Sequence, residues 1–348
     1  MRRFNYENLK DIKWDVEIVN YLSAIHEEKG KQSIYLKQRP DELNSLMEIA
    51  KIQSTESSNS IEGIRTTKTR LRQLMDEKTT PRNRDEKEIS GYRDALRLIH
   101  ENFEYIPLTP NYILQLHKVM FEHTGSSHGG QFKDVQNYIS AADADGKMYT
   151  LFTPLAPYET PMAMRDICDE FNRVIGAGEV DPLIVIPVFI HDFLCIHPFI
   201  DGNGRMSRLL TTLLLYRSGY EIGKYISLEA KIAKSKDEYY DALELSQAGW
   251  HEETDNPLPF IKYMLGTIIA AYRDFNDRMN LVGKSSFDTV YNAVISKIGK
   301  FTKRDIVELC PSLSAATVER NLKKLCADGI ITKSGGGRST FYIRNNKN

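Results

Sequence analysis

Two strongly apolar stretches separated by a short loop constrain the fold of this chain more than any other feature. Residues 183–196 are rich in Ile, Val and Phe, and residues 206–216 are rich in Leu. A helix that is apolar on all sides is buried in a core. Pro198 ends the first helix at His197, because proline disfavours the helical conformation of the residue before it. The sequence therefore predicts two buried helices joined by a loop at residues 197–205.

Helical patterns dominate the rest of the chain as well, so we expect a mainly α protein. One exception is a hairpin, in which residues 137–140 and 148–152 form strands around a turn at residues 143–147. The other exception is the C-terminal region, where three helices within residues 287–327 precede two strands around residues 335–338. Helices, a turn, a further helix and two strands are the pattern of a winged helix-turn-helix domain.

Charge is distributed unevenly between this C-terminal region and the remainder. The formal net charge is −1, but residues 285–348 hold 11 basic and 5 acidic side chains, against 35 and 42 elsewhere. A basic tail on an acidic body indicates that only the tail would favour a polyanion such as DNA. The four cysteines form no C-x-x-C pair, so we expect reduced thiols rather than a zinc or dithiol site (Cys168, Cys195, Cys310 and Cys326).

No part of the sequence points to a membrane. The residues after Met1 lack the apolar region of a signal peptide. The longest apolar run, residues 183–190, is too short to span a bilayer and is interrupted by Pro187. We therefore expect a cytoplasmic protein.

The loop between the two apolar helices holds the residues that can carry chemistry. Gly202 and Gly204 allow a positive φ and a close approach to a ligand, and consecutive N–H groups at a helix N-terminus bind anions. Arg205 and Arg208 lie three residues apart and can hold phosphate oxygens. They need an anion, because an unpaired charge on a buried helix is costly. Asp201 begins the loop, where a carboxylate suits Mg²⁺ held mainly by phosphates and water.

His197, at the end of the first helix, can accept a proton from an incoming hydroxyl at neutral pH. Together with the loop, it predicts transfer of a phosphorus-centred group, accelerated mainly by positioning and charge neutralisation. A different interpretation is a metal-dependent phosphohydrolase built on His191 and Asp192, which needs further ligands. His117 and His123 are present, but there is no second His-Asp pair. We therefore expect His191 to be a packed helix residue.

Residues 197–208 match H-P-F-x-[DE]-G-N-G-R-x-x-R at every defined position. This motif resembles the signature of the Fic-domain family of AMP transferases, and the similarity extends over residues 54–265. The resemblance implies ATP as substrate and Mg²⁺ as cofactor. His197 would deprotonate the target hydroxyl, Asp201 would hold Mg²⁺ between the α- and β-phosphates, and Phe199 would pack in the core. The nucleotide would be bound by the loop and the start of the helix (Gly202, Asn203, Gly204, Arg205, Met206, Ser207 and Arg208).

An earlier segment resembles the inhibitory motif of the same family, [ST]-x-x-x-E-[GN]. It comprises Ser58, Glu62 and Gly63, in a Ser- and Thr-rich stretch at residues 54–60 whose composition weakens a helix. The resemblance implies that Glu62 pairs with Arg208, takes the place of the γ-phosphate and inhibits transfer. The same carboxylate could instead orient a water molecule that removes AMP from a modified target.

Two other features resemble family elements that contact the substrates. Tyr239 and Tyr240 match a position that contacts the adenine, and an aromatic ring can stack on a base. The expected hairpin resembles the flap, along which a target protein would bind as an added strand. Lys133 stands where many relatives have Arg.

We therefore expect three regions in this chain. Residues 1–104 form a helical region with the inhibitory motif, residues 105–280 a Fic-type catalytic domain with the flap hairpin, and residues 285–348 the winged helix-turn-helix domain.

The expected function is that of a protein adenylyltransferase, which moves AMP from ATP to a Tyr, Thr or Ser hydroxyl of a target protein or of itself. Gly202 and Gly204 favour this over phosphate transfer, since the phosphate-transferring branch carries Ala and Lys there. The alternative is a DNA-binding regulator whose Fic-like domain senses nucleotide. An intact His197 favours the enzyme, because a sensor needs no base. The expected partners are a target protein along the hairpin and either DNA or a further protein at the tail, and the sequence leaves a homodimer open.

Overall fold

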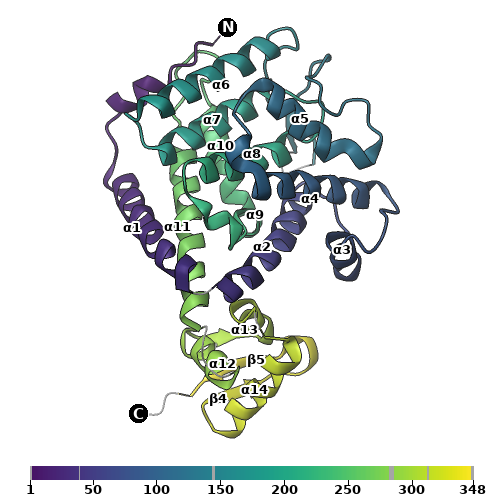
Figure 1. Cartoon of the computed structure of the whole chain (residues 1–348), viewed down its shortest axis with the longest axis vertical. Coiled ribbons are helices and arrows are strands. Elements are labelled where there is room, and N and C mark those ends of the chain that lie inside the picture. The colour runs from purple at the N-terminus through teal and green to yellow at the C-terminus, as the bar shows by residue number, and fades with distance from the viewer. Residues whose placement is uncertain (1, 39, 143–145, 282–285, 312, 346–348) are drawn as a thin grey trace. The chain divides into compact units, whose positions relative to one another are not determined.

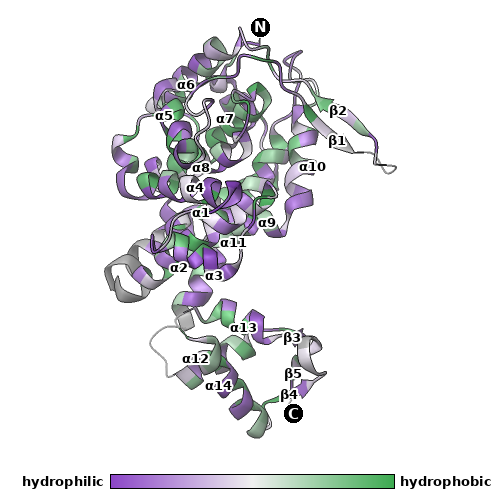
Figure 2. Cartoon of the chain, turned by 90° about the vertical axis from the view of Figure 1, so that its right-hand side faces the viewer, coloured by the Kyte–Doolittle hydropathy of each residue, from purple (hydrophilic) through white to green (hydrophobic). Residues whose placement is uncertain are grey.

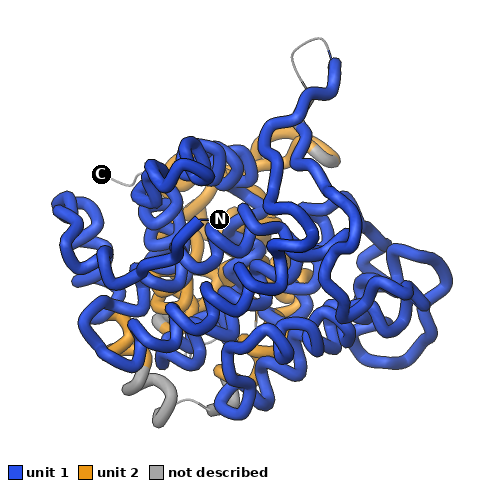
Figure 3. The backbone as a smooth tube through the Cα atoms, turned by 90° about the horizontal axis from the view of Figure 1, so that it is seen from above, with its two compact units in different colours: residues 1–27, 50–271 blue, residues 28–49, 272–348 orange. Residues whose placement is uncertain are grey.

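The computed structural model describes residues 2–38, 40–142, 146–281, 286–311 and 313–345. They fall into two compact units, which Figure 3 shows in blue (1–27 and 50–271) and orange (28–49 and 272–348). This division differs from the three expected regions, because helices of the expected N-terminal region pack against helices that follow it.

The first unit is built mainly from helices, which agrees with the expected mainly α class (Figure 1). Three of them, α1, α2 and α11, continue into residues of the second unit. The short helices α3 and α5 are not anticipated by the sequence patterns. The helices with residues in this unit are α1 (Val16–Gln38), α2 (Pro40–Ile61), α3 (Lys68–Met75), α4 (Arg84–Asn102), α5 (Pro110–Phe121), α6 (Thr160–Ala177), α7 (Pro182–Ile196), α8 (Asn203–Arg217), α9 (Leu228–Lys234), α10 (Lys236–Gln247) and α11 (Leu258–Leu281).

Helices α7 and α8 form the centre of this unit and pack directly against each other. Almost every side chain on both is buried, and Figure 2 shows the hydrophobic residues of α7 in green. Helix α6 packs on α7, and α4 packs on α5 and α8. The prediction of two buried helices joined by a short loop is therefore confirmed.

The loop begins and ends with residues in the left-handed conformation. Helix α7 ends at His197, with φ 51° and ψ 61°, and α8 begins after Gly202, with φ 84°. A Cβ atom at position 202 would lie 2.6 Å from Cε of Met120 and 2.8 Å from Cε2 of Phe121. Only glycine fits this turn, because it has no side chain to clash and tolerates a positive φ.

The expected hairpin strands are present as β1 (Ile139–Ala142) and β2 (Met148–Phe152), which pair antiparallel with an irregularity after Ile139. Residues 143–145 of the expected turn lie outside the described residues.

The second unit contains α12 (Ser286–Ile295), α13 (Lys303–Leu309) and α14 (Ala315–Ala327). Its strands β3 (Lys300–Phe301), β4 (Ile331–Ser334) and β5 (Phe341–Arg344) form an antiparallel sheet in the order β3-β5-β4. Strand β3 is an addition to the two strands expected from the sequence. A common core joins these helices to the sheet (Val290, Val294, Phe301, Ile306, Val318, Leu322, Leu325, Ile331 and Tyr342).

Among the residues that the structure describes, no helix is both long enough and apolar enough to cross a membrane.

Candidate active site

A cavity of about 270 Å³ lies over the loop between α7 and α8. Its wall combines residues from the end of α2, the hairpin, the loop and α10, which are far apart in the sequence. Most of the residues that the sequence predicted for the site line this cavity (Glu62, His197, Asp201, Gly202, Asn203, Gly204, Arg208, Tyr239 and Tyr240). Arg205, Met206 and Ser207 do not line it, so their expected contact with a nucleotide stays a prediction.

His197 is held in one orientation by the last turn of α7. Its backbone N–H donates to the carbonyl of Phe193 at 2.9 Å, and Nδ1 of its ring lies 3.2 Å from the carbonyl oxygen of Leu194. Because a carbonyl only accepts, we assign the ring proton to Nδ1, which leaves the lone pair on Nε2. Burial lowers the pKa of His197 to about 4. The ring is therefore neutral at pH 7 and can accept a proton.

The loop after His197 is closed by the side chain of Asn203. Its Oδ1 accepts from the backbone N–H of Phe199 at 2.9 Å, and its Nδ2 donates to the carbonyl of Phe199 at 2.8 Å. The Phe199 ring is fully buried and stacks on the ring of His117, with centroids 3.7 Å apart. The prediction that Phe199 packs in the core is confirmed, and the amide of Asn203 shapes the loop.

His117 supports the loop from α5. Its Nδ1 accepts from the backbone N–H of Gly130 at 2.9 Å, so the proton lies on Nε2, which donates to the carbonyl of Asp201 at 3.0 Å. Burial lowers the pKa of His117 to about 4, which keeps this single tautomer. From the sequence, His117 is expected only as a possible metal ligand. Nothing in its local pattern signals that it supports the loop, since both partners are backbone groups distant in sequence.

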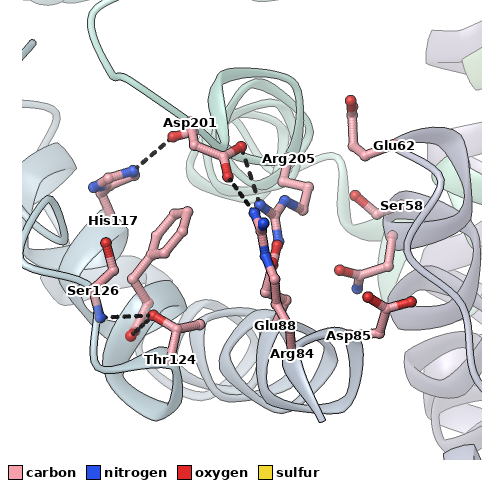
Figure 4. Close-up of polar contacts among 12 residues, drawn as sticks. Ser58, Glu62, Arg84, Asp85, Glu88, His117, Thr124, Ser126, Asp201 and Arg205 are labelled. Atoms are coloured by element: carbon pink, nitrogen blue, oxygen red, sulfur yellow. Dashed lines mark hydrogen bonds and ion pairs between the residues drawn. The ribbon is translucent and has the colours of Figure 1, made fainter.

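Asp201 belongs to a four-membered cluster of charged side chains (Figure 4). Its carboxylate lies 3.4 Å from Nη2 of Arg84 and 3.5 Å from Nη2 of Arg205. Nη1 of Arg205 lies 2.7 Å from Oε2 of Glu88, and Nε of Arg84 donates to Oε1 of Glu88 at 2.6 Å. The anion that buried Arg205 requires is therefore a protein carboxylate in this structure. A buried arginine predicts that such a partner exists, but the sequence does not say which one.

The donor set fits a Mg²⁺ ion that takes most of its ligands from a nucleotide. Asp201 lines the cavity and its side chain is 49% exposed. Within the described residues, no group of three or more His, Cys, Asp or Glu side chains could hold a metal ion alone. A single carboxylate is what Mg²⁺ needs when phosphates and water complete its shell.

Arg208 is bound by residues of α2. Its Nη2 lies 2.7 Å from Oε1 of Glu62, its Nε donates to Oγ of Ser58 at 2.8 Å, and its Nη2 donates to the carbonyl of Ser58 at 3.0 Å. Helix α2 continues to Ile61, and Gly63, with φ 81°, ends it. The expected pair of Glu62 and Arg208 is thus present in the structure.

The Glu62 carboxylate also reaches the glycine loop. A Cβ atom placed on Gly204 would overlap its Oε1 atom. Nζ of Lys236 on α10 donates to the carbonyl of Ile61 at 2.8 Å, which holds the end of α2 beside the cavity. Glu62 therefore lies where the sequence predicts an anion-binding site.

The two tyrosines on α10 differ in their surroundings. Tyr239 is buried and packs against the rings of Phe260 and Tyr263. Tyr240 is 42% exposed, lines the cavity and makes a T-shaped contact with Tyr239, with ring centroids 5.3 Å apart. Tyr240 is the better placed of the two to stack on a base, and this role stays a prediction for both.

Among the residues that the structure describes, His191 and Asp192 belong to no group of three or more side chains that could hold a metal ion. Both are buried, and Asp192 accepts hydrogen bonds from the hydroxyl of Tyr6 at 2.9 Å and from Nε1 of Trp250 at 2.7 Å. His191 contacts Sγ of Cys195 at 3.6 Å. These contacts agree with the prediction of a packed helix residue.

Comparison with known proteins finds similarity to the Fic/DOC family. Residues 107–215 match the Fic/DOC family. The chain is 25% identical over 218 residues to the protein adenylyltransferase fic-1 of Caenorhabditis elegans, which covers 62% of this chain and 38% of that protein. It is 27% identical over 251 residues to the protein adenylyltransferase Fic of Drosophila yakuba, with 70% and 43% covered. The chain thus spans less than half the length of these relatives.

Two solved structures share the fold. A Fic family protein from Desulfovibrio desulfuricans aligns with a TM-score of 0.62 at 20% identity, covering 97% of this chain and 98% of that one. A Fic domain containing signaling protein from Bacteroides thetaiotaomicron aligns with a TM-score of 0.58 at 23% identity, covering 74% of this chain and 94% of that one. Together with the loop motif, these findings show that residues 107–215 are similar to the Fic/DOC family and that the chain shares its fold with Fic family proteins.

Proposed function

We propose that this protein is a protein adenylyltransferase, which transfers AMP from ATP to a Tyr, Thr or Ser hydroxyl of a target protein or of itself. The observation that carries the proposal is His197, whose ring donates through Nδ1 to Leu194 and keeps the Nε2 lone pair beside the anion-binding start of α8. The names of the relatives, which are protein adenylyltransferases, support the same activity.

In the proposed reaction, Nε2 of His197 accepts the proton of the target hydroxyl as its oxygen attacks the α-phosphorus of ATP. The new O–P bond forms while the bond to the β-phosphate bridging oxygen breaks, and pyrophosphate leaves. Backbone N–H groups at residues 202–204 stabilise charge on the α-phosphate, and Arg208 holds the leaving phosphates. Mg²⁺ at Asp201 would supply further charge neutralisation.

The target protein would lie along the hairpin formed by β1 and β2. Strand edges can pair with an extended segment of another protein. Three large side chains of the hairpin and its base are exposed, Tyr138 at 59%, Met148 at 63% and Tyr149 at 47%, and they offer apolar contacts to such a segment.

Glu62 is proposed to inhibit this reaction. Its carboxylate pairs with Arg208 and reaches the glycine loop, so it competes with the terminal phosphates of ATP for the same guanidinium. A carboxylate at this place could also orient a water molecule for removal of AMP, and a labelled, modified target that loses AMP in parent protein but not in Glu62→Gly would reveal that second activity.

Labelled ATP tests the proposed transfer. The purified chain is incubated with Mg²⁺ and either α-labelled or γ-labelled ATP, and covalent label is measured after denaturation. Adenylyl transfer predicts stable label from α-labelled ATP alone, at a higher level in Glu62→Gly and none in Glu62→Gly with His197→Ala. Label from γ-labelled ATP alone would show phosphate transfer, and no label in Glu62→Gly would count against the proposed function.

A second proposal concerns the C-terminal unit, whose helices and three-stranded sheet fit a winged helix-turn-helix that contacts DNA. Helix α14 exposes Arg320 and Lys323. Glu319 offsets part of the positive charge of this helix, because it pairs with Lys323 at 3.2 Å and with Lys303 at 3.0 Å. A gel shift with the full chain at rising salt tests the proposal, and Arg320→Ala should lower the salt dependence by about one phosphate contact. No binding, or binding that salt does not weaken, would exclude DNA.

A further inference from the structure

The segment that leads into the hairpin donates hydrogen bonds to four consecutive carbonyls around the catalytic histidine. These carbonyls belong to Ile196, the last residue of α7, and to residues 197–199 of the loop that follows, and the donors in this segment belong to Lys133 and Asn137. Carbonyls at a helix C-terminus have no partner within the helix and must find one elsewhere. Two side chains and one backbone group at the base of the hairpin meet this need.

Lys133 supplies two of the four bonds. Its backbone N–H donates to the carbonyl of Pro198 at 2.8 Å, and its Nζ donates to the carbonyl of Ile196 at 2.9 Å. Nζ also donates to Oδ1 of Asn137 at 2.9 Å. The side chain is buried, and burial lowers the pKa of the ammonium to about 8. The two oxygens that Nζ contacts carry no formal charge. We infer that the buried ammonium serves mainly to orient the backbone at the negative C-terminal end of α7.

Asn137 supplies the other two bonds through a single amide. Its Nδ2 donates to the carbonyl of His197 at 3.1 Å and to the carbonyl of Phe199 at 2.9 Å. These contacts lie on either side of the bend that aims the ring. His197 has φ 51°, a left-handed conformation that costs about 1–2 kcal/mol for a residue with a side chain. The bend therefore needs such external support.

The same segment is continuous with the hairpin. Asn137 lies two residues before the start of β1 at Ile139. Its neighbour Gln136 donates through Nε2 to the carbonyl of Pro154, just after β2, at 3.1 Å. The base of the hairpin is thus closed across both strands at the point where it contacts the catalytic loop.

We propose that Lys133 and Asn137 are positioning residues that hold His197 in its reactive orientation and connect the hairpin to the catalytic loop. The inference rests on the proposed function of the hairpin as the surface that receives the target. A target segment added to the hairpin would then be placed relative to His197 by a rigid set of hydrogen bonds. A misplacement of about 1 Å at a reacting group can lower a rate by about 100-fold.

The test uses the full chain with Glu62→Gly, in which incorporation of α-labelled AMP is measured. Asn137→Asp removes both donors and sets a carboxylate against two carbonyls, and Lys133→Met removes the ammonium. Each change should lower the maximal rate by about 10- to 100-fold, with the KM for ATP unchanged within about twofold. Lys133→Arg, which retains a donor, should restore most of the rate. Asn20→Asp, at an exposed site on α1, controls for the added charge.

A second readout does not depend on activity. In protein labelled with ¹⁵N-histidine, the ring signal of His197, assigned by its loss in His197→Ala, reports the tautomer. The parent should show Nδ1–H alone, and Asn137→Asp should show a mixture of both tautomers. An unchanged rate and tautomer, or a fall in rate matched by weaker ATP binding, would overturn the proposal. If the parent incorporates no label, the proposed function fails, while the tautomer still decides the positioning role.

Discussion

Replacement of Glu62 by glycine is expected to raise the rate of AMP incorporation by roughly 10- to 30-fold. Glu62 Oε1 lies 2.7 Å from Nη2 of Arg208, and the two side chains are 32% and 3% exposed. A hydrogen bond to a charged group is worth about 1.5–3 kcal/mol, whereas a fully exposed pair is worth less than about 1. The partial exposure of Glu62 favours the lower part of that range, about 1.5–2 kcal/mol. Each 1.36 kcal/mol is about tenfold in rate.

The same substitution should raise the rate but slightly lower the folding stability. Arg208 keeps its hydrogen bonds to Oγ and the carbonyl of Ser58 after Glu62 is removed, so no bare buried charge is left. We expect a loss of about 1 kcal/mol, which lowers Tm by about 1–2 °C in a chain of this size. A variant that is faster but slightly less stable indicates release of an inhibitor rather than general loosening.

The assay compares initial rates at ATP concentrations well below KM, where competition for Arg208 affects the rate, for the parent, Glu62→Gly and Glu62→Gln. Glutamine keeps the shape of the side chain but not its charge, so it should give an intermediate rate. Glu56→Gln, on the exposed face of α2, removes a carboxylate that does not pair with Arg208 and serves as the matched control. A Glu62→Gly rate equal to that of the parent, or an equal gain in Glu56→Gln, would refute the competition between Glu62 and the phosphates.

His197→Asn should lower the rate by about 10²- to 10⁴-fold without weaker ATP binding, and weaker binding would argue for a structural role. In the parent, the rate should fall only as the pH approaches about 4, because burial lowers the pKa of His197 to about 4; a fall centred near pH 6.5, the ordinary pKa of histidine, would contradict this. Arg84→Ala removes a guanidinium that competes with a cation for the carboxylate of Asp201. Mn²⁺ binding, measured by electron paramagnetic resonance, should therefore become about fivefold tighter, and an unchanged affinity would contradict the pairing. Folding stability should fall as the pH drops from about 6.5, because unfolded histidines take up protons that four buried histidines refuse when folded, namely His100 and His191 (pKa about 3) and His117 and His197 (pKa about 4). Proton uptake by folded Asp192, whose pKa burial raises to about 6, offsets part of this loss, and urea unfolding at pH 7 and 5.5 should differ by about 4 kcal/mol; equal stability would contradict the shifts.

The parts of the fold that the sequence predicts well are those set by local patterns. The apolarity of residues 183–196 and the constraint of Pro198 are enough to place α7, its end and the turn of the chain. The strands of the hairpin are likewise indicated by their own composition and agree with β1 and β2. In these segments, no partner distant in sequence is needed to decide the conformation.

Distant contacts override the local signal in the inhibitory segment. Residues 54–60 are rich in Ser and Thr, which favours an early end to the helix, but α2 continues to Ile61. The hydroxyl of Ser58 accepts a hydrogen bond from Arg208, and Nδ2 of Asn59 donates to the carbonyl of Thr55 within the helix. Because these two side chains have partners, they do not compete with the helix for its backbone hydrogen bonds. The Arg208 contact joins residues 150 positions apart, and no short-range pattern reports it.

The partner of Arg205 is also distant in sequence, so no short-range pattern reports it. Such distant contacts fix the loop independently of Glu62, and inhibition can therefore depend on that one side chain. The loop is fixed by Glu88 through Arg205, by His117 through the carbonyl of Asp201, and by the segment of Lys133 and Asn137. All four of these anchors are buried or mostly shielded. Glu62, by contrast, is 32% exposed and follows the last residue of α2. Its carboxylate can rotate into solvent without breaking any bond that shapes the loop. The loop is therefore already in its active conformation and needs no refolding when the Glu62 carboxylate leaves. The free energy needed to release the inhibition is only that of breaking the pair of Glu62 and Arg208.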